Sequence, residues 1–189
     1  MALRIDTIKN NFSLSLSTLT HTLTHALLGS LFLALMSQLA FYVPFSPVPV
    51  TMQTFALPLL VVFQGRNRAI ASILCYLAEA TCGMPVLAGG ESNPLWMVGP
   101  RAGFLIGFIA MAFMVGTLLE KRKSPSFLFL AALFLAGHAL VLFMGSAWLG
   151  LFVGADAAFA MGVSPFILGT VLKSFAAAFA SIPLLKKKS

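Results

Sequence analysis

Lys173 is the residue whose type and position most clearly indicate chemistry. It stands eight residues into the last long apolar run, which starts at Pro165, so a helix would place it about 12 Å below that end. A lysine at the centre of a membrane-spanning helix costs about 3 kcal/mol on insertion scales, and snorkelling relieves only part of that cost. Such a residue normally faces the interior of a helix bundle, where a partner or a ligand neutralises it.

Arg101 and Glu79 are further ionisable residues in apolar surroundings. Arg101 opens another apolar run, where it could instead be an anchor at the membrane interface. Asp156 and Glu91 could pair with the cations across loops, and an anionic ligand is the other way to neutralise them. Glu79 either pairs with a neighbouring polar group, or is protonated, or helps to form a binding site.

The other reactive side chains do not combine into a catalytic or metal site. Cys75 and Cys82 lie seven residues apart on one predicted helix, about 10 Å apart along its axis, which is too far for a disulfide. No histidine lies near them in the sequence, so we expect two buried thiols and no metal. Ser146 and His138 also share a predicted helix, about 12 Å apart along its axis, so they cannot form the pair of an intramembrane serine protease. We therefore predict that the protein is not an enzyme.

The elements that position these residues must lie in a membrane. The 189 residues are 59% hydrophobic and only 9% charged, with 18 phenylalanines, whereas a soluble domain carries about 25% charged residues. The net charge of +7 and the isoelectric point of about 9.9 could indicate nucleic acid binding. However, the basic residues form short clusters between apolar runs, as the positive-inside rule places them in membrane proteins. The expected partner of this surface is therefore a lipid bilayer and not a nucleic acid.

Six apolar runs can form spanning helices, and no linker divides them into two domains. They cover residues 25–42, 52–63, 69–87, 102–119, 126–149 and 165–185. A span takes about 20 residues, and fewer where protein shelters the helix, as the short second run requires. The first run lacks the small-x-small exit of a cleaved signal peptide. We predict an all-α membrane protein with six transmembrane helices in one bundle (residues 25–189), preceded by a cytoplasmic or interfacial segment (residues 1–24) that could also be disordered.

The basic residues also predict the orientation of this bundle. Ten of the twelve lie on one side of a six-helix serpentine: Arg4, Lys9, Arg66, Arg68, Lys121, Arg122, Lys123, Lys186, Lys187 and Lys188. That side should be cytoplasmic, with both termini inside. The opposite connections hold most of the unusual residues, namely Gln53, Glu91, Asn93, Trp96, Arg101 and Asp156. Either these residues form a binding site on the outer face, or they belong to solvated loops.

Four segments, in order, resemble the motifs of the BioY family of biotin transporters. Residues 47–54 (PVPVTMQT) resemble P-V-P-V-T-x-Q-T, and residues 83–90 (GMPVLAGG) resemble G-x-P-V-F-A-G-G. Residues 99–108 (GPRAGFLIGF) resemble G-P-T-x-G-Y-L-x-G-F, and residues 165–173 (PFILGTVLK) resemble P-F-x-P-G-D-x-x-K. The resemblance covers about residues 34–185. Thr170 stands where the family usually has aspartate, Arg101 where threonine is common, and Phe104 where tyrosine is common.

This resemblance implies the S component of an energy-coupling factor transporter, a multi-pass protein of the bacterial cell membrane. In that family it captures the vitamin outside and docks on a transmembrane T component driven by two ATPases. It uses no cofactor, since biotin is the transported ligand. The sequence contains no G-x-x-x-x-G-K-[ST] loop for nucleotide phosphates. Given the departures from the motifs, the ligand could also be another vitamin or a small anion, and a structural membrane subunit without a ligand is a third possibility.

Biotin has a ureido group, an apolar bicyclic ring and a carboxylate tail, and each needs a partner in a buried site. We expect Gln53 and Asn93 to bind the ureido group, because each side chain has both a donor and an acceptor, with Thr170 as a weaker helper. Trp96 and Tyr42 could lie against the rings, or belong to an aromatic belt at the membrane interface. Lys173 and Arg101 would bind the carboxylate or neutralise Asp156.

Small residues on the first helix indicate a helix-packing surface. Ala26, Ser30 and Ala34 recur at four-residue spacing, and small side chains allow close approach of helices in lipid. In S components such a face resembles the surface that meets the T component, so we predict partner docking here. The alternative is that this ridge packs against another helix of the same bundle.

Overall fold

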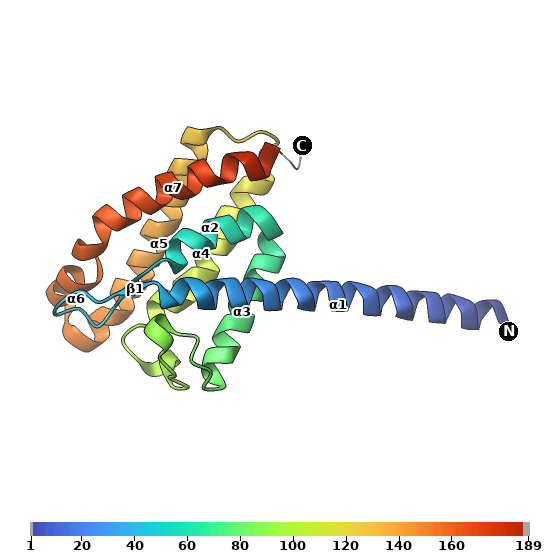
Figure 1. Ribbon diagram of the computed structural model, residues 1–189, viewed down its shortest axis with the longest axis horizontal. Coiled ribbons are helices and arrows are strands. Elements are labelled where there is room, and N and C mark those ends of the chain that lie inside the picture. Colours follow the sequence, from blue (N-terminus) through green and yellow to red (C-terminus); the bar gives the residue numbers. More distant parts are fainter. Residues whose placement is uncertain (1, 187–189) are drawn as a thin grey trace.

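The computed structural model describes the backbone of residues 2–186 and the side chains from residue 20 to residue 186. The fold is a bundle of helices with one short hairpin (Figure 1). The helices are α1 (Ala2–Gln38), α2 (Gln53–Gln64), α3 (Arg66–Thr81), α4 (Ala102–Glu120), α5 (Phe127–Val153), α6 (Ala155–Gly162) and α7 (Ile167–Lys186). Strands β1 (Ala40–Phe41) and β2 (Val50–Thr51) pair antiparallel, and single 3₁₀ turns form at η1 (Ala88–Gly90), η2 (Trp96–Val98) and η3 (Ser164–Phe166).

Helices α2, α4, α5 and α7 begin and end close to the bounds of the predicted apolar runs. The third run was predicted to continue to residue 87, but α3 ends at Thr81 because Gly83 has a φ of 81° and Pro85 follows it. The prediction of two buried thiols was therefore also wrong. Cys75 is half-buried inside α3, and Cys82 is exposed just beyond its end.

Two further parts of the helical structure were not predicted. The connection 150–164 contains α6, which begins after Gly154, where a φ of 82° breaks the chain away from α5. Helix α1 continues through residues 2–24, so the N-terminal segment and the first apolar run form one helix that extends beyond the bundle (Figure 1).

Three described segments are long and apolar enough to cross a membrane: Ala102–Glu120, Phe127–Val153 and Ala155–Lys186. Helix α2 is apolar but has only 12 residues. It packs against α1, α3, α4 and α7, so neighbouring helices shelter it and it need not span the full lipid thickness by itself.

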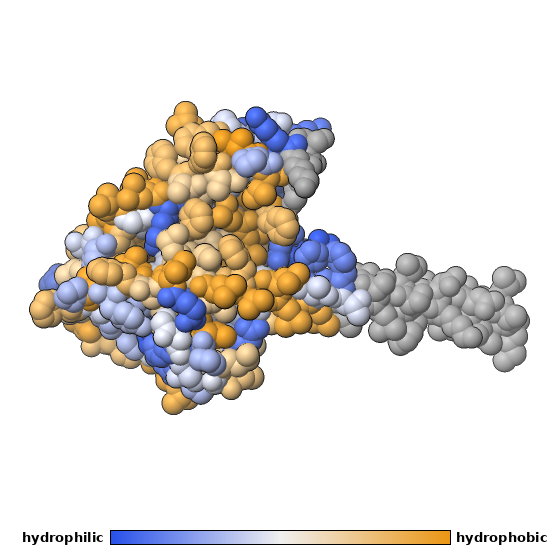
Figure 2. Space-filling view, viewed as in Figure 1, coloured by the Kyte–Doolittle hydropathy of each residue, from blue (hydrophilic) through white to orange (hydrophobic). Residues whose placement is uncertain are grey.

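The exterior of the bundle is strongly apolar. Leu128, Phe143, Leu151 and Phe179 are each more than 70% exposed, and hydrophobic residues cover much of the visible face in Figure 2. Monomeric soluble proteins rarely expose such large contiguous apolar surfaces. This surface therefore suits lipid, as the composition predicted.

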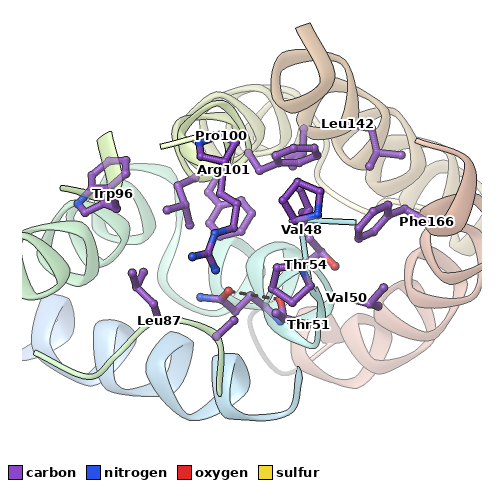
Figure 3. A pocket seen from close by; sticks show the side chains of 18 of the residues that line it. Val48, Val50, Thr51, Thr54, Leu87, Trp96, Pro100, Arg101, Leu142 and Phe166 are labelled. Carbon is purple, nitrogen blue, oxygen red and sulfur yellow. Dashed lines mark hydrogen bonds between the residues drawn. The ribbon is translucent and has the colours of Figure 1, made fainter. Parts of the chain in front are cut away.

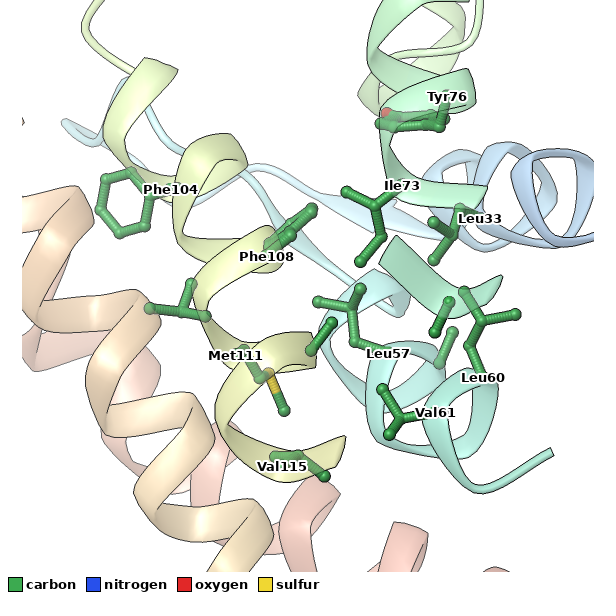
Figure 4. Packing of buried hydrophobic residues seen from close by; sticks show 14 of the residues in the cluster. Leu33, Leu57, Leu60, Val61, Ile73, Tyr76, Phe104, Phe108, Met111 and Val115 are labelled. Atoms are coloured by element: carbon green, nitrogen blue, oxygen red, sulfur yellow. The ribbon is translucent and has the colours of Figure 1, made fainter. Parts of the chain in front are cut away.

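Buried hydrophobic side chains of α1, α2, α3 and α4 pack together in the interior (Figure 4). Between α4 and α5, glycines let the helices approach closely. A Cβ atom added at Gly103 of α4 would lie 2.3 Å from Cβ of Trp148 and 2.6 Å from the carbonyl oxygen of Met144, both on α5. A Cβ at Gly145 of α5 would lie 2.1 Å from the ring of Phe104. Because lipid gives helices no hydrophobic drive to associate, such close contact is what holds them together.

The small-residue ridge on α1 packs inside the bundle. Ala26 and Ser30 are 7% and 1% exposed, and Ala34 packs half-buried against the core. Ser30 Oγ donates a hydrogen bond of 2.7 Å to Glu79 Oε1 on α3. The ridge therefore faces α3 and is not free for a partner, which corrects the docking prediction and gives Glu79 an interhelical partner.

The packing of α4 on α5 can be tested with Gly103→Ala. We expect the new methyl group to lower the free energy of unfolding by about 1–3 kcal/mol, because it overpacks a backbone contact. The measurement is the thermal-unfolding midpoint of the purified protein in detergent micelles. Gly169→Ala on α7 is the control, since no atom lies within 4 Å of an added Cβ there. Equal shifts for the two variants would show that close packing at Gly103 is not important.

Candidate functional site

A cavity of about 220 Å³ lies between α2, α3, α4, α5 and α7. The extended chain 47–51 and the loop between α3 and α4 also contribute to its wall. This volume is somewhat below the roughly 300–1,000 Å³ of typical small-molecule sites, so it suits a compact ligand. In Figure 3 the Arg101 side chain reaches from the start of α4 towards the centre, with Phe166 and Leu142 on one flank and Trp96 and Leu87 on the other.

Most of the cavity wall is apolar. Val48 and Val50 come from the extended chain before α2, Phe104 and Phe108 from α4, and Phe166 from η3. The extended chain exists because Pro47 and Pro49 cannot take part in a helix ladder there. This wall can accept a hydrophobic ring system.

Three polar atoms on this wall are buried without a partner. Gln53 Nε2, Tyr76 Oη and His138 Nε2 form no hydrogen bond of normal length and angle with a described residue, although their residues are 3%, 0% and 2% exposed. Their nearest polar neighbours are Gln53 and Ser37 for the Tyr76 hydroxyl and the backbone of Thr54 for His138. Roughly 90% or more of buried polar groups in proteins have a partner. Three exceptions on one cavity indicate that water or a ligand completes them.

The neighbours of these atoms fix what each can bind. His138 Nδ1 lies 2.8 Å from the carbonyl oxygen of Phe134, which can only accept, and 3.0 Å from Ser174 Oγ, whose own proton goes to the carbonyl oxygen of Thr170 at 2.8 Å. These neighbours assign the proton of the neutral ring to Nδ1, which makes Nε2 an acceptor. Gln53 Oε1 accepts from Thr51 Oγ1 at 3.3 Å, which leaves the Gln53 amide nitrogen as a donor. Tyr76 Oη can do either. The cavity thus offers a donor, an acceptor and a group that can be both.

Lys173 also lines the cavity and has only neutral partners. Its Nζ donates to the carbonyl oxygen of Thr51 at 2.7 Å and to Thr54 Oγ1 at 3.3 Å. Neither of the ion pairs formed within residues 20–186 includes it. Its positive charge is therefore not compensated by a described acidic side chain.

Arg101 differs from Lys173 because it has an acidic partner. Its Nη2 lies 2.5 Å and 2.6 Å from the two carboxylate oxygens of Glu91. Both side chains are partly exposed, at 25% and 34%. This is the loop pairing that the sequence allowed, and it leaves one uncompensated cation on the cavity wall.

The structure brings six of the eight predicted binding residues together on the cavity wall: Gln53, Asn93, Trp96, Arg101, Thr170 and Lys173. It does not bring Tyr42 or Asp156 there. Tyr42 is 57% exposed and donates to the carbonyl oxygen of Ala88 at 3.0 Å, so it ties the hairpin to η1. Asp156 is exposed in the first turn of α6. Both assignments are corrected, because residues that share an end of the bundle need not share a cavity.

Some of the assigned side chains are already engaged. Trp96 Nε1 donates to Thr81 Oγ1 at 2.9 Å, and Asn93 Oδ1 accepts from the backbone of Leu95 at 3.1 Å. Trp96 is therefore a fixed wall, and Asn93 retains its amide N–H groups for other contacts.

Sequence reasoning missed Tyr76 and His138 as cavity residues. Tyr76 was not singled out, and His138 was considered only as a protease base. Both are polar residues within apolar helices, which is the signal that drew attention to Lys173. Their helix faces could not be assigned without the packing of α3 and α5.

Comparison with protein families and known proteins gives consistent matches. The model of the BioY family matches residues 8–188. The biotin transporter BioY2 of Lactococcus lactis is 31% identical over 178 residues, which cover 92% of this chain and 94% of that protein. The probable biotin transporter BioY of Pyrococcus horikoshii is 34% identical over 148 residues, which cover 78% of this chain and 87% of that protein.

A solved structure shares the fold. It is the crystal structure of the S-component for biotin from an ECF-type ABC transporter, and it superposes with a TM-score of 0.80 at 25% sequence identity. The match covers 90% of this chain and 93% of the solved chain.

The unpaired hydroxyl of Tyr76 predicts an unusual stability effect. Tyr76→Phe should raise the unfolding free energy of the ligand-free protein by about 1 kcal/mol, because it removes a buried polar atom that has no partner. Tyr42→Phe, which deletes a hydroxyl that is hydrogen-bonded to Ala88, should lower it. Thermal-unfolding midpoints of both variants, measured without added ligand, test the pair. A loss of stability in Tyr76→Phe would mean that the protein itself satisfies this hydroxyl.

Proposed function

Because the chain belongs to the BioY family, we propose that it is the substrate-binding S component of an energy-coupling factor transporter, and that biotin occupies the cavity. Its family and its apolar helices make it a multi-pass protein of the cell membrane. The observation that carries the proposal is the set of unpaired polar atoms on an apolar cavity beside an uncompensated lysine.

The polar atoms match a ureido group. Its carbonyl oxygen accepts hydrogen bonds and its two N–H groups donate them. Gln53 Nε2 can donate to the carbonyl, His138 Nε2 can accept from an N–H group, and Tyr76 Oη can serve either. Asn93 and Thr170, which also line the cavity, remain candidates for the same end of the ligand. The apolar wall would enclose the bicyclic ring.

The carboxylate of biotin matches the charge of the cavity. Lys173 has two neutral partners and keeps a third N–H for a ligand. A carboxylate bound there would form a charge-assisted hydrogen bond, which is roughly twice as strong as a neutral one. An anionic ligand thus supplies the counter-charge that described acidic residues do not supply. Another small anion is the second candidate, because Thr170 provides no carboxylate where the family motif has aspartate.

We propose that α1, α2, α3, α4, α5 and α7 are the six spans, with both termini in the cytoplasm. The beginning of α1 and the end of α7 lie on the same side of Figure 1, and α6 and the hairpin lie on the other. Arg66 and Glu120 form an ion pair of 3.4 Å between the start of α3 and the end of α4, as expected if both ends reach the same water layer. Lys187 and Lys188 of the predicted basic cluster lie outside the described residues.

On this proposal the loaded subunit hands biotin to the cell with a T component and two ATPases. Because the small-residue ridge of α1 is buried against α3, we propose that the T component docks instead on the exposed leucines of α1, Leu27, Leu31 and Leu35.

Site-directed labelling tests the orientation. In a background with Cys75→Ser and Cys82→Ser, cysteines placed by Ser92→Cys and Ser124→Cys should react from opposite sides, since both positions are exposed. A membrane-impermeant maleimide added to intact cells should label the first variant and reach the second only after lysis. Labelling of both from outside would end this topology.

Ligand binding tests the role of Lys173. Lys173→Ala should weaken binding of biotin by about tenfold or more and affect the uncharged biotin methyl ester far less, because only the acid has a charge to pair. Titration calorimetry on the purified protein measures both ligands. Asn93→Ala should weaken both alike and serves as the comparison. Equal losses in Lys173→Ala would assign the lysine a structural role or place it at the ureido carbonyl, and an unsubstituted chain that binds neither ligand would refute the proposed function.

A further inference from the structure

Glu91 lies next to the cavity without forming its wall. It follows η1, where Gly89 and Gly90 have φ values of 68° and 77°, and its carbonyl oxygen accepts from the backbone nitrogen of Leu87 at 3.2 Å. From there its carboxylate reaches Arg101, which does line the cavity. The loop thus places an acid behind a cation that faces the ligand space.

The geometry of this pair leaves much of the guanidinium unused. Both oxygens of Glu91 contact the same nitrogen, Nη2 of Arg101, at 2.5 Å and 2.6 Å. A guanidinium has five N–H donors, and the hydrogen bonds that the structure describes for Arg101 all come from Nη2. The remaining donors belong to a side chain that points into the cavity in Figure 3. Glu91 therefore cancels the charge of Arg101, while the other N–H groups of the Arg101 guanidinium stay available to a ligand.

The charges around the cavity then sum to a single positive unit. Lys173 and Arg101 are the cations among its lining residues, and Glu91 is the acid paired with one of them. We infer that Glu91 sets the charge selectivity of the cavity: it positions Arg101 and cancels its charge, so that the cavity selects a ligand with one negative charge over a neutral or doubly negative one. This inference rests on the proposed function, because it concerns the same cavity and a carboxylate ligand.

If Glu91 served only to hold the loop, Glu91→Gln would displace the loop and change the binding of all ligands equally. The loop is also held by Ser37 Oγ, which donates to the carbonyl oxygen of Val86 at 2.6 Å, and by the hydroxyl of Tyr42 on Ala88. These contacts do not depend on Glu91, so Glu91→Gln should leave the loop in place. Its amide oxygen can still accept from Arg101, and the main change is the loss of one negative charge.

The experiment compares three ligands that share the biotin rings and carry zero, one and two negative charges: biotin methyl ester, biotin, and a biotin analogue with a second carboxylate on its tail. In Glu91→Gln the affinity for the dicarboxylate relative to biotin should rise about fivefold, equivalent to about 1 kcal/mol, and affinity for the ester should stay unchanged. This gain should shrink as the salt concentration rises, because salt screens charges that are partly exposed. Glu91→Asp, which keeps the charge, should restore the original order of affinities.

Asp156→Asn is the matched control, because it removes the same charge from an exposed position outside the cavity wall. It should leave all three affinities unchanged. The inference would be overturned if Asp156→Asn raised the affinity for the dicarboxylate relative to biotin as much as Glu91→Gln does. It would also be overturned if Glu91→Gln changed the affinities for all three ligands equally. In both cases biotin binding by the unsubstituted chain would leave the proposed function standing. Failure of the unsubstituted chain to bind biotin would overturn both.

Discussion

The ammonium group of Lys173 has to be solvated inside an apolar bundle, and much of the surrounding structure follows from this constraint. Polar atoms at membrane depth find partners only within the protein or in a water-filled cavity. Here the main partner is the carbonyl oxygen of Thr51, 2.7 Å away. Thr51 ends strand β2 and directly precedes Met52, the N-cap of α2, so its carbonyl lies outside the hydrogen-bond ladder of the helix. The lysine thus links α7 to the start of α2, and the cavity forms where the two meet.

The position of α2 adds a second effect at the same place. Helix α2 begins at Gln53, so its first turn lies beside Lys173, which also contacts Thr54. The free N–H groups of a helix start carry a partial positive charge. A cation beside them is disfavoured unless an anion joins both. The short central helix and the lysine therefore favour the same kind of ligand, and neither effect depends on the other.

The bounds of most helices could be predicted from the sequence, because apolar runs in a membrane protein are long and uninterrupted. The course of the loops, and the face that each helix turns towards its neighbours, could be predicted only in part. Lys173, Arg101 and Gln53 could be predicted as cavity residues, because a polar side chain in or beside an apolar run needs a partner or a ligand. Tyr42 and Asp156 were misplaced because the course of the outer loops depends on contacts such as Ser46 Oγ with the carbonyl oxygen of Met161, 2.8 Å apart, which span 115 residues and leave no local pattern.

The absence of a local sequence pattern for long-range contacts also explains why the partner of the small-residue ridge on α1 could not be predicted. The spacing of Ala26 and Ser30 correctly indicated a surface for close helix approach, but spacing does not name the helix that approaches. Glu79 on α3 decides this, because a carboxylate at that depth needs a donor and Ser30 provides one. A polar residue on the facing helix is thus a better guide to the partner of a small-residue face than the face itself.

Two of the departures from the BioY motifs, Thr170 and Arg101, bear on the charge of the cavity. A lysine and an aspartate at positions 173 and 170 would cancel each other, whereas Thr170 leaves Lys173 uncompensated among the described residues. Arg101 adds a second cation, but Glu91 pairs with it, so the pair contributes no net charge. The cavity is therefore one unit more positive than the motif pattern gives. An uncompensated positive charge is costly in an empty apolar cavity. A ligand carboxylate therefore binds with a larger gain in free energy here than it would beside a lysine that already has an acidic partner.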